Sequence, residues 1–528
     1  MSLRLSRPDT RAMNRNAPVL SNNLDALFLE SRKCQARYDF AGAIEVLQRA
    51  RRLEPANDKI LVDLGAACAK AYDFAAAQRW FDEAIRITLT PVPALNAIGH
   101  AWLEVRNYEA AQACFERLFK EKQVPVVAFI RLSEIYIRRR RLADADEITG
   151  RALHLYGPLD AVLLARGNVH RQLGQFDLAE KLYNVLVSRP AGDPLVRAFG
   201  YYELASLHDH KREYDKAMSA LLEGKALMRQ GAAQPLKILR EKQAHLKEMQ
   251  QSASEQAVQR WRKAGTTDLQ PPRKLALLCG HARSGTTLLE YVIDAHPGVV
   301  SAEESTVFHN KAYYPLGRAV SRNATFVSSL DWFPARTMRQ IRSEYFNGIE
   351  SLLGEPIGDR LLLDKNPANT FDVPAIARIF PENKFVAALR DPRDVCLSCF
   401  MQPVNILPDT AAWLSLEETV QHYAAIMGLW AAWKPCLGEL AIEVRYEDLV
   451  DNLEASARRV LAFLDLPWDD RVVRFHEHAS SKVVRSPTFA EVTKPLYRAS
   501  VGRWRNYQKY FEPHLPKLAP LLRAFGYE

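Results

Sequence analysis

Through the first 230 residues, apolar and polar positions alternate with a helical period, and the pattern itself repeats. An aromatic residue or a leucine recurs as an anchor. The anchors are Phe40, Phe74, Tyr108, Leu142, Phe176 and Tyr214. The first four intervals are 34 residues and the last is 38, and an alanine follows every anchor three residues later. A third position, seven residues after the anchor, completes one helical face, so the pattern predicts successive helices with a common buried side.

Small residues precede most anchors by nine positions and would let two helices pack closely. They are Gly65, Gly99, Ser133, Gly167 and Ala205. Together with the period, these positions resemble the tetratricopeptide repeat, a helix-turn-helix unit. The resemblance implies an all-α solenoid over residues 20–230, whose concave surface would bind a protein or peptide, either a substrate or a partner. A scaffold used only for dimerisation or positioning remains an alternative.

The repeat pattern fails after residue 230. Residues 236–262 are charged and helix-prone, whereas residues 264–272 are rich in turn-forming residues. We therefore expect a helical segment and linker over residues 231–272, with a domain boundary near 265–272, and a further domain over 273–528.

That domain opens with an apolar run, Leu275 to Cys279, typical of a buried parallel strand. Gly280 and Gly285 follow with the spacing of a nucleotide-binding P-loop, and an apolar helical segment comes next. Such a loop points its N–H groups and the helix N-terminus at a phosphate or sulfate. A P-loop NTPase has a lysine where this chain has Thr286, which disfavours an ATPase or kinase. The candidate anion-binding residues are Arg283, Ser284, Gly285, Thr286 and Thr287; a structural turn without a ligand is the alternative.

The segment GHARSGTTL resembles the 5′-phosphosulfate loop of sulfotransferases that use 3′-phosphoadenosine 5′-phosphosulfate (PAPS). The usual form is G-x-P-R-S-G-T-T-L, and Ala282 replaces the proline. A second strand-like run ends at Arg390, and Ser398 follows eight residues later, as in the family's 3′-phosphate site; an arginine–aspartate turn is the alternative. The resemblance implies an α/β, P-loop-like domain with a parallel sheet, PAPS as co-substrate, and transfer without a metal.

Other positions resemble functional residues of the tyrosylprotein sulfotransferases. Glu304 follows a D-A-H-P-x-V stretch and matches their catalytic base, which accepts the proton of the acceptor hydroxyl. Lys365 matches a lysine at the sulfuryl group, and with Arg283 it would stabilise the transition state. Tyr446 and Lys494 match nucleotide-binding positions. The structural alternatives are a solvated acid for Glu304, a surface lysine for Lys365 and a core tyrosine for Tyr446.

One family position differs: Gln402 stands where the family has a further arginine, so one phosphate contact is expected to be missing. Seven cysteines, odd in number and scattered, are typical of reduced thiols. Cys396 and Cys399 form a CxxC pair. Without a second pair, helix packing is favoured over redox chemistry or zinc binding.

Composition adds only broad constraints. The formal net charge of +9 suits an anionic cofactor, but no motif of a nucleic-acid-binding fold accompanies it. The N-terminus is basic and polar without an apolar core, and no window approaches the roughly 18 apolar residues of a membrane span. We therefore expect a cytoplasmic protein that binds no nucleic acid.

Three functions remain open after this reading. We expect a PAPS-dependent sulfotransferase that acts on protein tyrosine, with a carbohydrate, lipid or small-molecule hydroxyl as the alternative acceptor. The second possibility is an interaction protein whose sulfotransferase domain is inactive and whose repeats bind partners. The third is an enzyme that uses ATP or GTP.

Overall fold

The computed structural model describes residues 23–36, 38–269, 272–318, 325–403, 405–481, 498 and 500–528. The chain divides into two compact units, Met1–Val105 and Arg106–Glu528. This division falls within the predicted repeats, and the boundaries predicted at residues 230 and 272 remain predictions.

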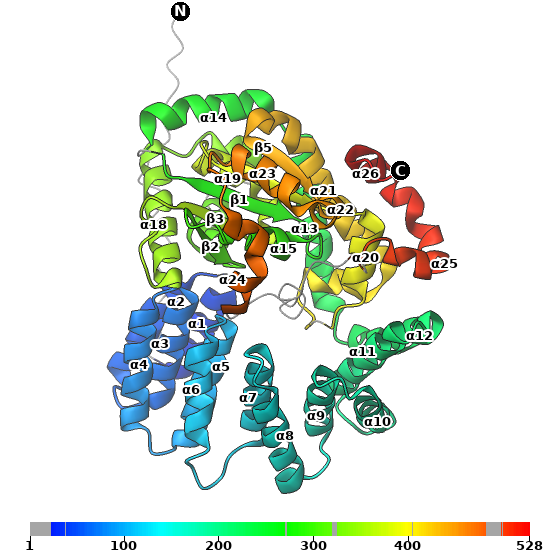
Figure 1. The fold of residues 1–528 in the computed structure, drawn as a ribbon. Helices are drawn as coiled ribbons and strands as arrows, with labels where there is room; N and C mark the ends of the chain where they lie inside the picture. The colour runs from blue at the N-terminus through cyan, green and yellow to red at the C-terminus, as the bar shows by residue number, and fades with distance from the viewer. Residues whose placement is uncertain are drawn as a thin grey trace, which may run out of the picture. The chain divides into compact units, whose positions relative to one another are not determined.

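Five helices form the described part of the first unit. They are α1 (Leu24–Ala36), α2 (Phe40–Leu53), α3 (Asp58–Lys70), α4 (Phe74–Ile87) and α5 (Pro91–Glu104) (Figure 1). The predicted anchors begin α2 and α4, and an aspartate caps each of these helices by accepting a backbone hydrogen bond. Gly65 allows α3 and α4 to pack closely, because a Cβ at this position would lie 2.3 Å from the Phe81 ring.

The same pattern of helices opens the second unit. Its first helices are α6 (Tyr108–Leu118), α7 (Val126–Arg138), α8 (Leu142–Tyr156), α9 (Asp160–Gln172), α10 (Phe176–Val187), α11 (Pro194–His210) and α12 (Tyr214–Arg229). Gly167 repeats the role of the small residue, since a Cβ there would lie 2.4 Å from the Tyr183 ring. The helical repeat predicted from the sequence is therefore confirmed.

A left-handed residue lies two positions before each anchor. These residues are Tyr38, Tyr72, Arg106, Arg140, Gly174 and Arg212, with φ between 55° and 76°. Five of the six are not glycine, although a side chain disfavours this conformation. The turn of the repeat therefore imposes the same backbone geometry on residues of different type.

Two helices occupy the segment predicted as helix and linker, α13 (Ala233–Gln251) and α14 (Glu255–Asp268). The turn-rich stretch predicted from residue 264 is wrong for residues 264–268, which are helical. Packing explains the difference: Trp261 stacks on Trp433 with ring centroids 6.2 Å apart. Gly265 then lets the helix approach Pro381 closely, because a Cβ on this glycine would lie 2.3 Å from the proline ring.

A five-stranded parallel sheet organises the rest of the unit, in the order β2-β3-β1-β4-β5. The strands are β1 (Leu275–Gly280), β2 (Val299–Glu303), β3 (Leu361–Lys365), β4 (Lys384–Leu389) and β5 (Ala441–Arg445). Every residue of β1 and β3 is buried, as their apolar runs predict. The predicted fold class, helical repeats followed by an α/β domain with a parallel sheet, is confirmed.

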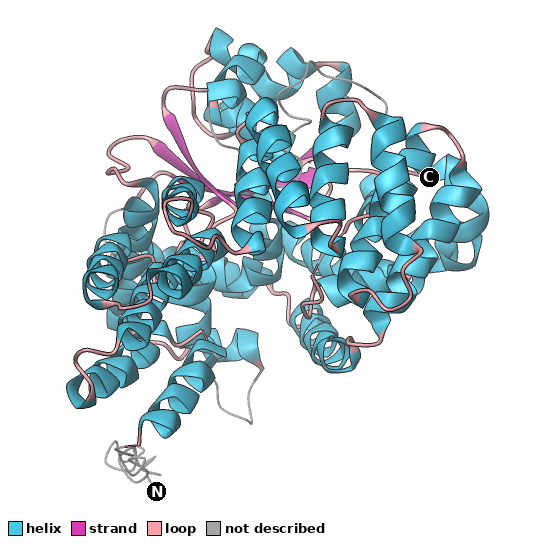
Figure 2. Cartoon of the chain, turned by 90° about the horizontal axis from the view of Figure 1, so that it is seen from below, coloured by secondary structure: helices cyan, strands magenta, loops and turns pink. Residues whose placement is uncertain are grey.

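Helices surround the strands, as Figure 2 shows. They include α15 (Thr286–Asp294), α16 (Tyr314–Arg318), α17 (Phe326–Leu330), α18 (Ala335–Leu353), α19 (Val373–Ile379), α20 (Pro392–Phe400), α21 (Leu416–Leu437), α22 (Tyr446–Asp451), α23 (Leu453–Phe463), α24 (Phe475–Ser481), α25 (Gln508–Phe511) and α26 (Leu515–Phe525). Helices α15 and α23 pack on one face of the sheet and share a core cluster with β1, β3 and β4. The parallel strands bring their carboxyl ends to one edge, and the strand order reverses direction at β1, where open α/β sheets bind ligands.

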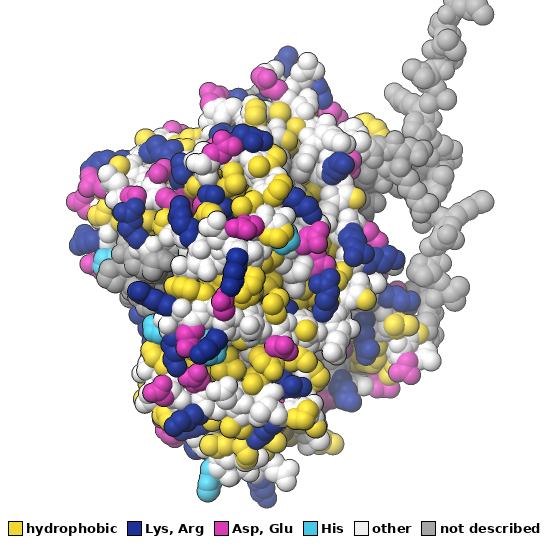
Figure 3. All heavy atoms as spheres, turned by 90° about the vertical axis from the view of Figure 1, so that its right-hand side faces the viewer, with side chains coloured by type: hydrophobic (Ala, Val, Ile, Leu, Met, Phe, Trp, Pro, Cys, Tyr) yellow, Lys and Arg dark blue, Asp and Glu magenta, His cyan; other side chains and the backbone are white. Residues whose placement is uncertain are grey.

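The surface carries both signs of charge. On the face drawn in Figure 3, lysine and arginine side chains are interspersed with aspartate and glutamate. Within the described ranges, no helix combines the length and hydropathy needed to cross a membrane.

Candidate functional site

The loop between β1 and α15 has the predicted strand–loop–helix form. Gly280 and Gly285 have φ of 130° and 92°, in the region that favours glycine. A Cβ at Gly280 would lie 2.4 Å from the carbonyl oxygen of Ala388 on β4, and a Cβ at Gly285 would lie 2.7 Å from Cδ2 of Tyr446. The two glycines therefore allow the backbone to curl closely against β4 and Tyr446.

The two strongest sequence motifs meet at this loop. Nε of Arg283 donates to Oγ of Ser398 at 3.0 Å, and Nη1 of Arg390 donates to the carbonyl oxygen of Arg283 at 3.2 Å. The Arg390 guanidinium also lies 5.1 Å from the centroid of the Tyr446 ring. Four residues predicted from three segments are thus brought together, and Tyr446 contacts the site instead of acting only as a core residue.

The donors at this site fit an anion. Arg390 is 8% exposed, and within the described part of the chain its buried Nε–H has no hydrogen-bond partner. A buried donor without a partner is costly, and a phosphate oxygen would satisfy it. Ser284, Thr286 and Thr287 are buried in the loop and at the start of α15, where helix N-termini attract anions.

Lys365, at the end of β3, is fully buried, so the surface-lysine alternative is wrong. Its Nζ lies 3.0 Å from Oε2 of Glu290 and 3.1 Å from Oε1 of Glu304. Burial alone would lower the pKa of Lys365, but the surrounding carboxylates, led by Glu290 and Glu304, raise it above its usual value. Lys365 is therefore a charged ammonium inside the domain.

Glu304 follows β2 and has a left-handed backbone, with φ of 47°. Its N–H donates to the carbonyl oxygen of Lys365 at 2.7 Å, and its side chain is 16% exposed. Oε1 accepts from Lys365, and Oε2 accepts from Nη1 of Arg106 at 2.5 Å. Burial alone would raise the pKa of Glu304, but Lys365 and Arg106 lower it to about 2. The alternative of a solvated acid at a strand end is therefore wrong.

Two residues of this cluster were not predicted from the sequence. Glu290 lies on α15 and is 1% exposed, and burial raises its pKa. The sequence did contain a signal for Glu290, because it is an acidic residue within the apolar segment that forms α15. Buried charges are normally paired, so a buried cation could have been expected beside it. Arg106 lies 198 residues before Glu304, and no local pattern marked it.

The segment after the predicted nucleotide loop is anchored to α20. Lys494 itself lies outside the described residues, so its predicted role stays a prediction. Asp394 accepts hydrogen bonds from the N–H groups of Gly502 and Trp504, at 2.7 and 2.8 Å. Nη2 of Arg390 donates to the carbonyl oxygen of Ser500 at 2.5 Å. These contacts hold the chain near the candidate phosphate site.

Cys396 and Cys399 are both buried and unbonded to each other within α20. Burial raises the pKa of both thiols, that of Cys399 to about 12, which opposes formation of a reactive thiolate. Burial and the absence of a bond between the two thiols support the packing interpretation. Among the residues that the structure describes, no group of three or more histidine, cysteine, aspartate or glutamate side chains is arranged to bind a metal.

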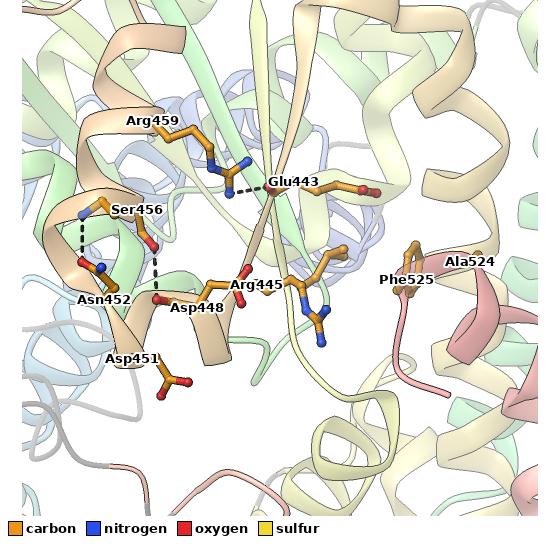
Figure 4. A pocket seen from close by; sticks show the side chains of 11 residues that line it. Glu443, Arg445, Asp448, Asp451, Asn452, Ser456, Arg459, Ala524 and Phe525 are labelled. Atoms are coloured by element: carbon orange, nitrogen blue, oxygen red, sulfur yellow. Dashed lines mark hydrogen bonds between the residues drawn. The ribbon is translucent and has the colours of Figure 1, made fainter.

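A separate hollow of about 550 Å³ lies beyond β5 (Figure 4). Glu443, Asp448 and Asp451 line it together with Arg445 and Arg459. Nη2 of Arg459 donates to the backbone oxygen of Glu443 at 3.0 Å. Because carboxylates outnumber the cations, this hollow suits a doubly phosphorylated nucleotide less well than the loop after β1.

Comparison with known proteins extends these observations. Residues 276–470 match the sequence profile of the sulfotransferase family. An uncharacterized protein of Aquifex aeolicus is 25% identical over 63% of this chain and 43% of its own length. Protein-tyrosine sulfotransferase A of Caenorhabditis elegans is 29% identical over 47% of this chain and 66% of its own length. The chain thus spans less than two thirds of either relative.

Among solved structures, a tetratricopeptide repeat protein of Parabacteroides merdae is similar, with 19% identity and a TM-score of 0.31 over 39% of this chain and 83% of that chain.

The match to the sulfotransferase family profile covers β1 to β5, together with the loop after β1, Glu304, Lys365 and Arg390. The C-terminal half of this chain therefore contains a domain of the sulfotransferase family.

Proposed function

We propose that this chain is a PAPS-dependent sulfotransferase whose acceptor is the hydroxyl of a protein tyrosine. The observation that carries the proposal is the meeting of Arg283, Ser398 and Arg390 at the ends of β1 and β4. At the ends of the neighbouring strands, Lys365 and Glu304 lie 3.1 Å apart. An anion site next to a paired base and ammonium is what sulfuryl transfer to a hydroxyl requires.

The chain offers donors for both ends of PAPS. The loop N–H groups, the N-terminus of α15 and Arg283 suit the phosphosulfate end. Arg390 and Ser398 suit the 3′-phosphate, because the fork of an arginine matches phosphate oxygens and the Nε–H of Arg390 has no partner within the described residues. The Tyr446 ring lies close both to Gly285 of the loop and to the Arg390 guanidinium.

PAPS would supply the sulfuryl group. A bond forms between the acceptor oxygen and sulfur as the bond from sulfur to the phosphate oxygen breaks, and the electron pair of the broken bond stays with the leaving phosphate. Glu304 accepts the proton of the acceptor hydroxyl. Lys365 and Arg283 stabilise the charge that develops on the transferred group and the leaving phosphate, an effect worth several kcal/mol in such sites.

Two observations support a polypeptide acceptor. The Caenorhabditis elegans relative is named as a protein-tyrosine sulfotransferase. The helical hairpins α6 to α12 belong to the same chain, and arrays of helical repeats commonly bind polypeptides. We propose that the repeats present the acceptor protein to the sulfotransferase domain.

The test uses the full chain, ³⁵S-labelled PAPS and a cell lysate, with the labelled products separated into protein, lipid and glycan. We expect label on protein, recovered as sulfotyrosine after hydrolysis. Label confined to lipid or glycan would refute the tyrosine acceptor but retain the sulfotransferase. E304Q is expected to abolish turnover and to leave nucleotide binding within about twofold, because the base acts only in the chemical step.

E344Q is a matched control, since Glu344 is an exposed glutamate on α18 of the same domain. It is expected to behave as the wild type. Binding of 3′-phosphoadenosine 5′-phosphate (PAP), measured by calorimetry, tests the nucleotide site independently. Absence of PAP binding would favour a repeat-based interaction protein with an inactive domain, and a preference for magnesium ATP or GTP would favour a nucleoside-triphosphate enzyme.

A further inference from the structure

Arg106 lies in the turn just before α6 and reaches the proposed catalytic base. Its Nη1 donates to Oε2 of Glu304 at 2.5 Å, while Nζ of Lys365 donates to Oε1 at 3.1 Å. A guanidinium and an ammonium therefore hold the two oxygens of one carboxylate. Arg106 is 37% exposed and Glu304 is 16% exposed, so water screens this pair less than it screens a typical surface ion pair.

The backbone of the repeat fixes where Arg106 stands. Arg106 is the left-handed turn residue of its repeat, with φ of 57°, and Arg140 and Arg212 are its equivalents, with φ of 58° and 62°. The position is therefore a regular feature of the repeat. Arg140 and Arg212 are exposed, whereas Arg106 is half-buried against Glu304. Three of the six repeats thus carry an arginine at this turn, and Arg106 is the one of these three that is not exposed.

Arg106 also balances the charges around Glu304. Lys365 on β3 faces Glu290 from α15, and it also faces Glu304 and Glu303 at the end of β2. The Arg106 guanidinium adds a second cation, which faces both Glu304 and Glu303. Burial alone would raise the pKa of Glu304, but the two cations lower it to about 2. Glu304 is thereby kept ionised, the protonation state that a base needs before the reaction.

Arg106 also restrains a strained residue. The left-handed backbone of Glu304 is unfavourable for a side chain and persists only where the surroundings hold it. The N–H of Glu304 is held by the carbonyl of Lys365 and its carboxylate by both cations. Loss of Arg106 would free Oε2 and leave the carboxylate held at one oxygen.

We infer that Arg106 is a positioning residue for sulfuryl transfer, which orients the Glu304 carboxylate and so makes the turn before α6 part of the catalytic centre. The inference rests on the proposed function, because it requires Glu304 to be the base. Arg106 acts through Glu304 and needs no contact with the donor or the acceptor.

The test compares R106Q, R106K and R140Q in the full chain. Transfer of label from PAPS to a tyrosyl peptide is measured from pH 3 to 9, and PAP affinity and Tm are measured for the same variants. R106Q is expected to lower kcat about tenfold or more, while the KM for PAPS stays within about twofold. The acid limb of its pH profile is expected to move up by about one pH unit or more, from below pH 3 in the wild type into the measured range, because loss of the guanidinium raises the pKa of Glu304.

Two variants separate this role from a structural one. R106K retains the positive charge and is expected to restore most of the acid limb and part of kcat. R140Q changes the equivalent exposed turn arginine and is expected to match the wild type. If R106Q melts far below the wild type, the acid limb and kcat of R106K decide the question instead.

The outcomes are distinct. A wild-type kcat and pH profile in R106Q, or a raised kcat, would overturn the inference while leaving the sulfotransferase assignment intact. A wild-type chain that transfers no label from PAPS would overturn the proposed function, and this inference with it.

Discussion

Replacing Gly285 by alanine tests the proposed anion-binding loop most directly. Gly285 is the residue before α15 and has φ of 92° and ψ of 10°. A Cβ added there would lie 2.7 Å from Cδ2 of Tyr446, closer than real Cβ atoms approach a neighbour. G285A therefore combines an unfavourable backbone with a collision, and both act where the loop N–H groups converge.

Gly354 separates these two effects. It ends α18 with φ of 72° and ψ of 10°, nearly the same backbone, but a Cβ there would meet nothing within 4 Å. G354A should cost about 1 kcal/mol from the backbone alone. G285A should cost that amount plus about 1–3 kcal/mol for overpacking. Since 1 kcal/mol corresponds to about 2–4 °C for a domain of this size, we expect Tm losses of about 2–4 °C and about 4–16 °C respectively.

The assay measures Tm by calorimetry and PAP affinity by titration for both variants. G285A should weaken PAP binding by about tenfold or more, because the loop must move away from Tyr446, whereas G354A should bind PAP as the wild type does. Y446A in the G285A background should recover part of the lost stability by removing the collision. Equal Tm losses in G285A and G354A, with normal PAP binding in both, would refute this account of the loop.

Two further substitutions test the remaining parts of the site. S398A removes the hydroxyl that accepts from Arg283 and is expected to weaken PAP binding by about tenfold to a hundredfold, since a hydrogen bond to a charged group is worth about 1.5–3 kcal/mol. Unchanged affinity by calorimetry would place the 3′-phosphate elsewhere. K365M removes the ammonium between Glu290 and Glu304 and is expected to lower kcat by about a hundredfold or more while PAP affinity stays within about threefold. Turnover near the wild-type rate would show that Lys365 is structural.

The parts of the fold that are encoded locally could be predicted from the sequence. The strand, loop and helix from Leu275 to Asp294 fall within one short segment, whose apolar run, glycine spacing and helical pattern all agree. The helical hairpins could be predicted equally well, because every repeat has the same pattern of contact residues. A small residue such as Gly167 predicts a close approach, and a Cβ there would indeed collide with Tyr183.

Prediction failed where tertiary packing outweighs local propensity. Residues 264–268 contain a glycine and two threonines, which favour a turn, yet they continue α14. The stacking of Trp261 on Trp433 fixes this helix against α21, and a glycine at position 265 leaves room for Pro381. Neither partner lies near α14 in the sequence, so no local window contains the information.

The ion pairs of Glu304 with Lys365 and Arg106 likewise could not be predicted from local sequence. A pattern of residues can place Glu304 and Lys365 at strand ends, but the sequence gives no distance between them, and it gives no reason to connect either with Arg106. The sheet register supplies the first connection, because Glu303 pairs with Lys365 and the next residue then lies beside the ammonium. The connection between Glu304 and Arg106 depends on a turn that lies 198 residues earlier in the chain. Once Lys365 is known to be buried beside Glu290 and Glu304, however, a buried ionised carboxylate favours a second cation nearby, and Arg106 supplies that cation at Glu304.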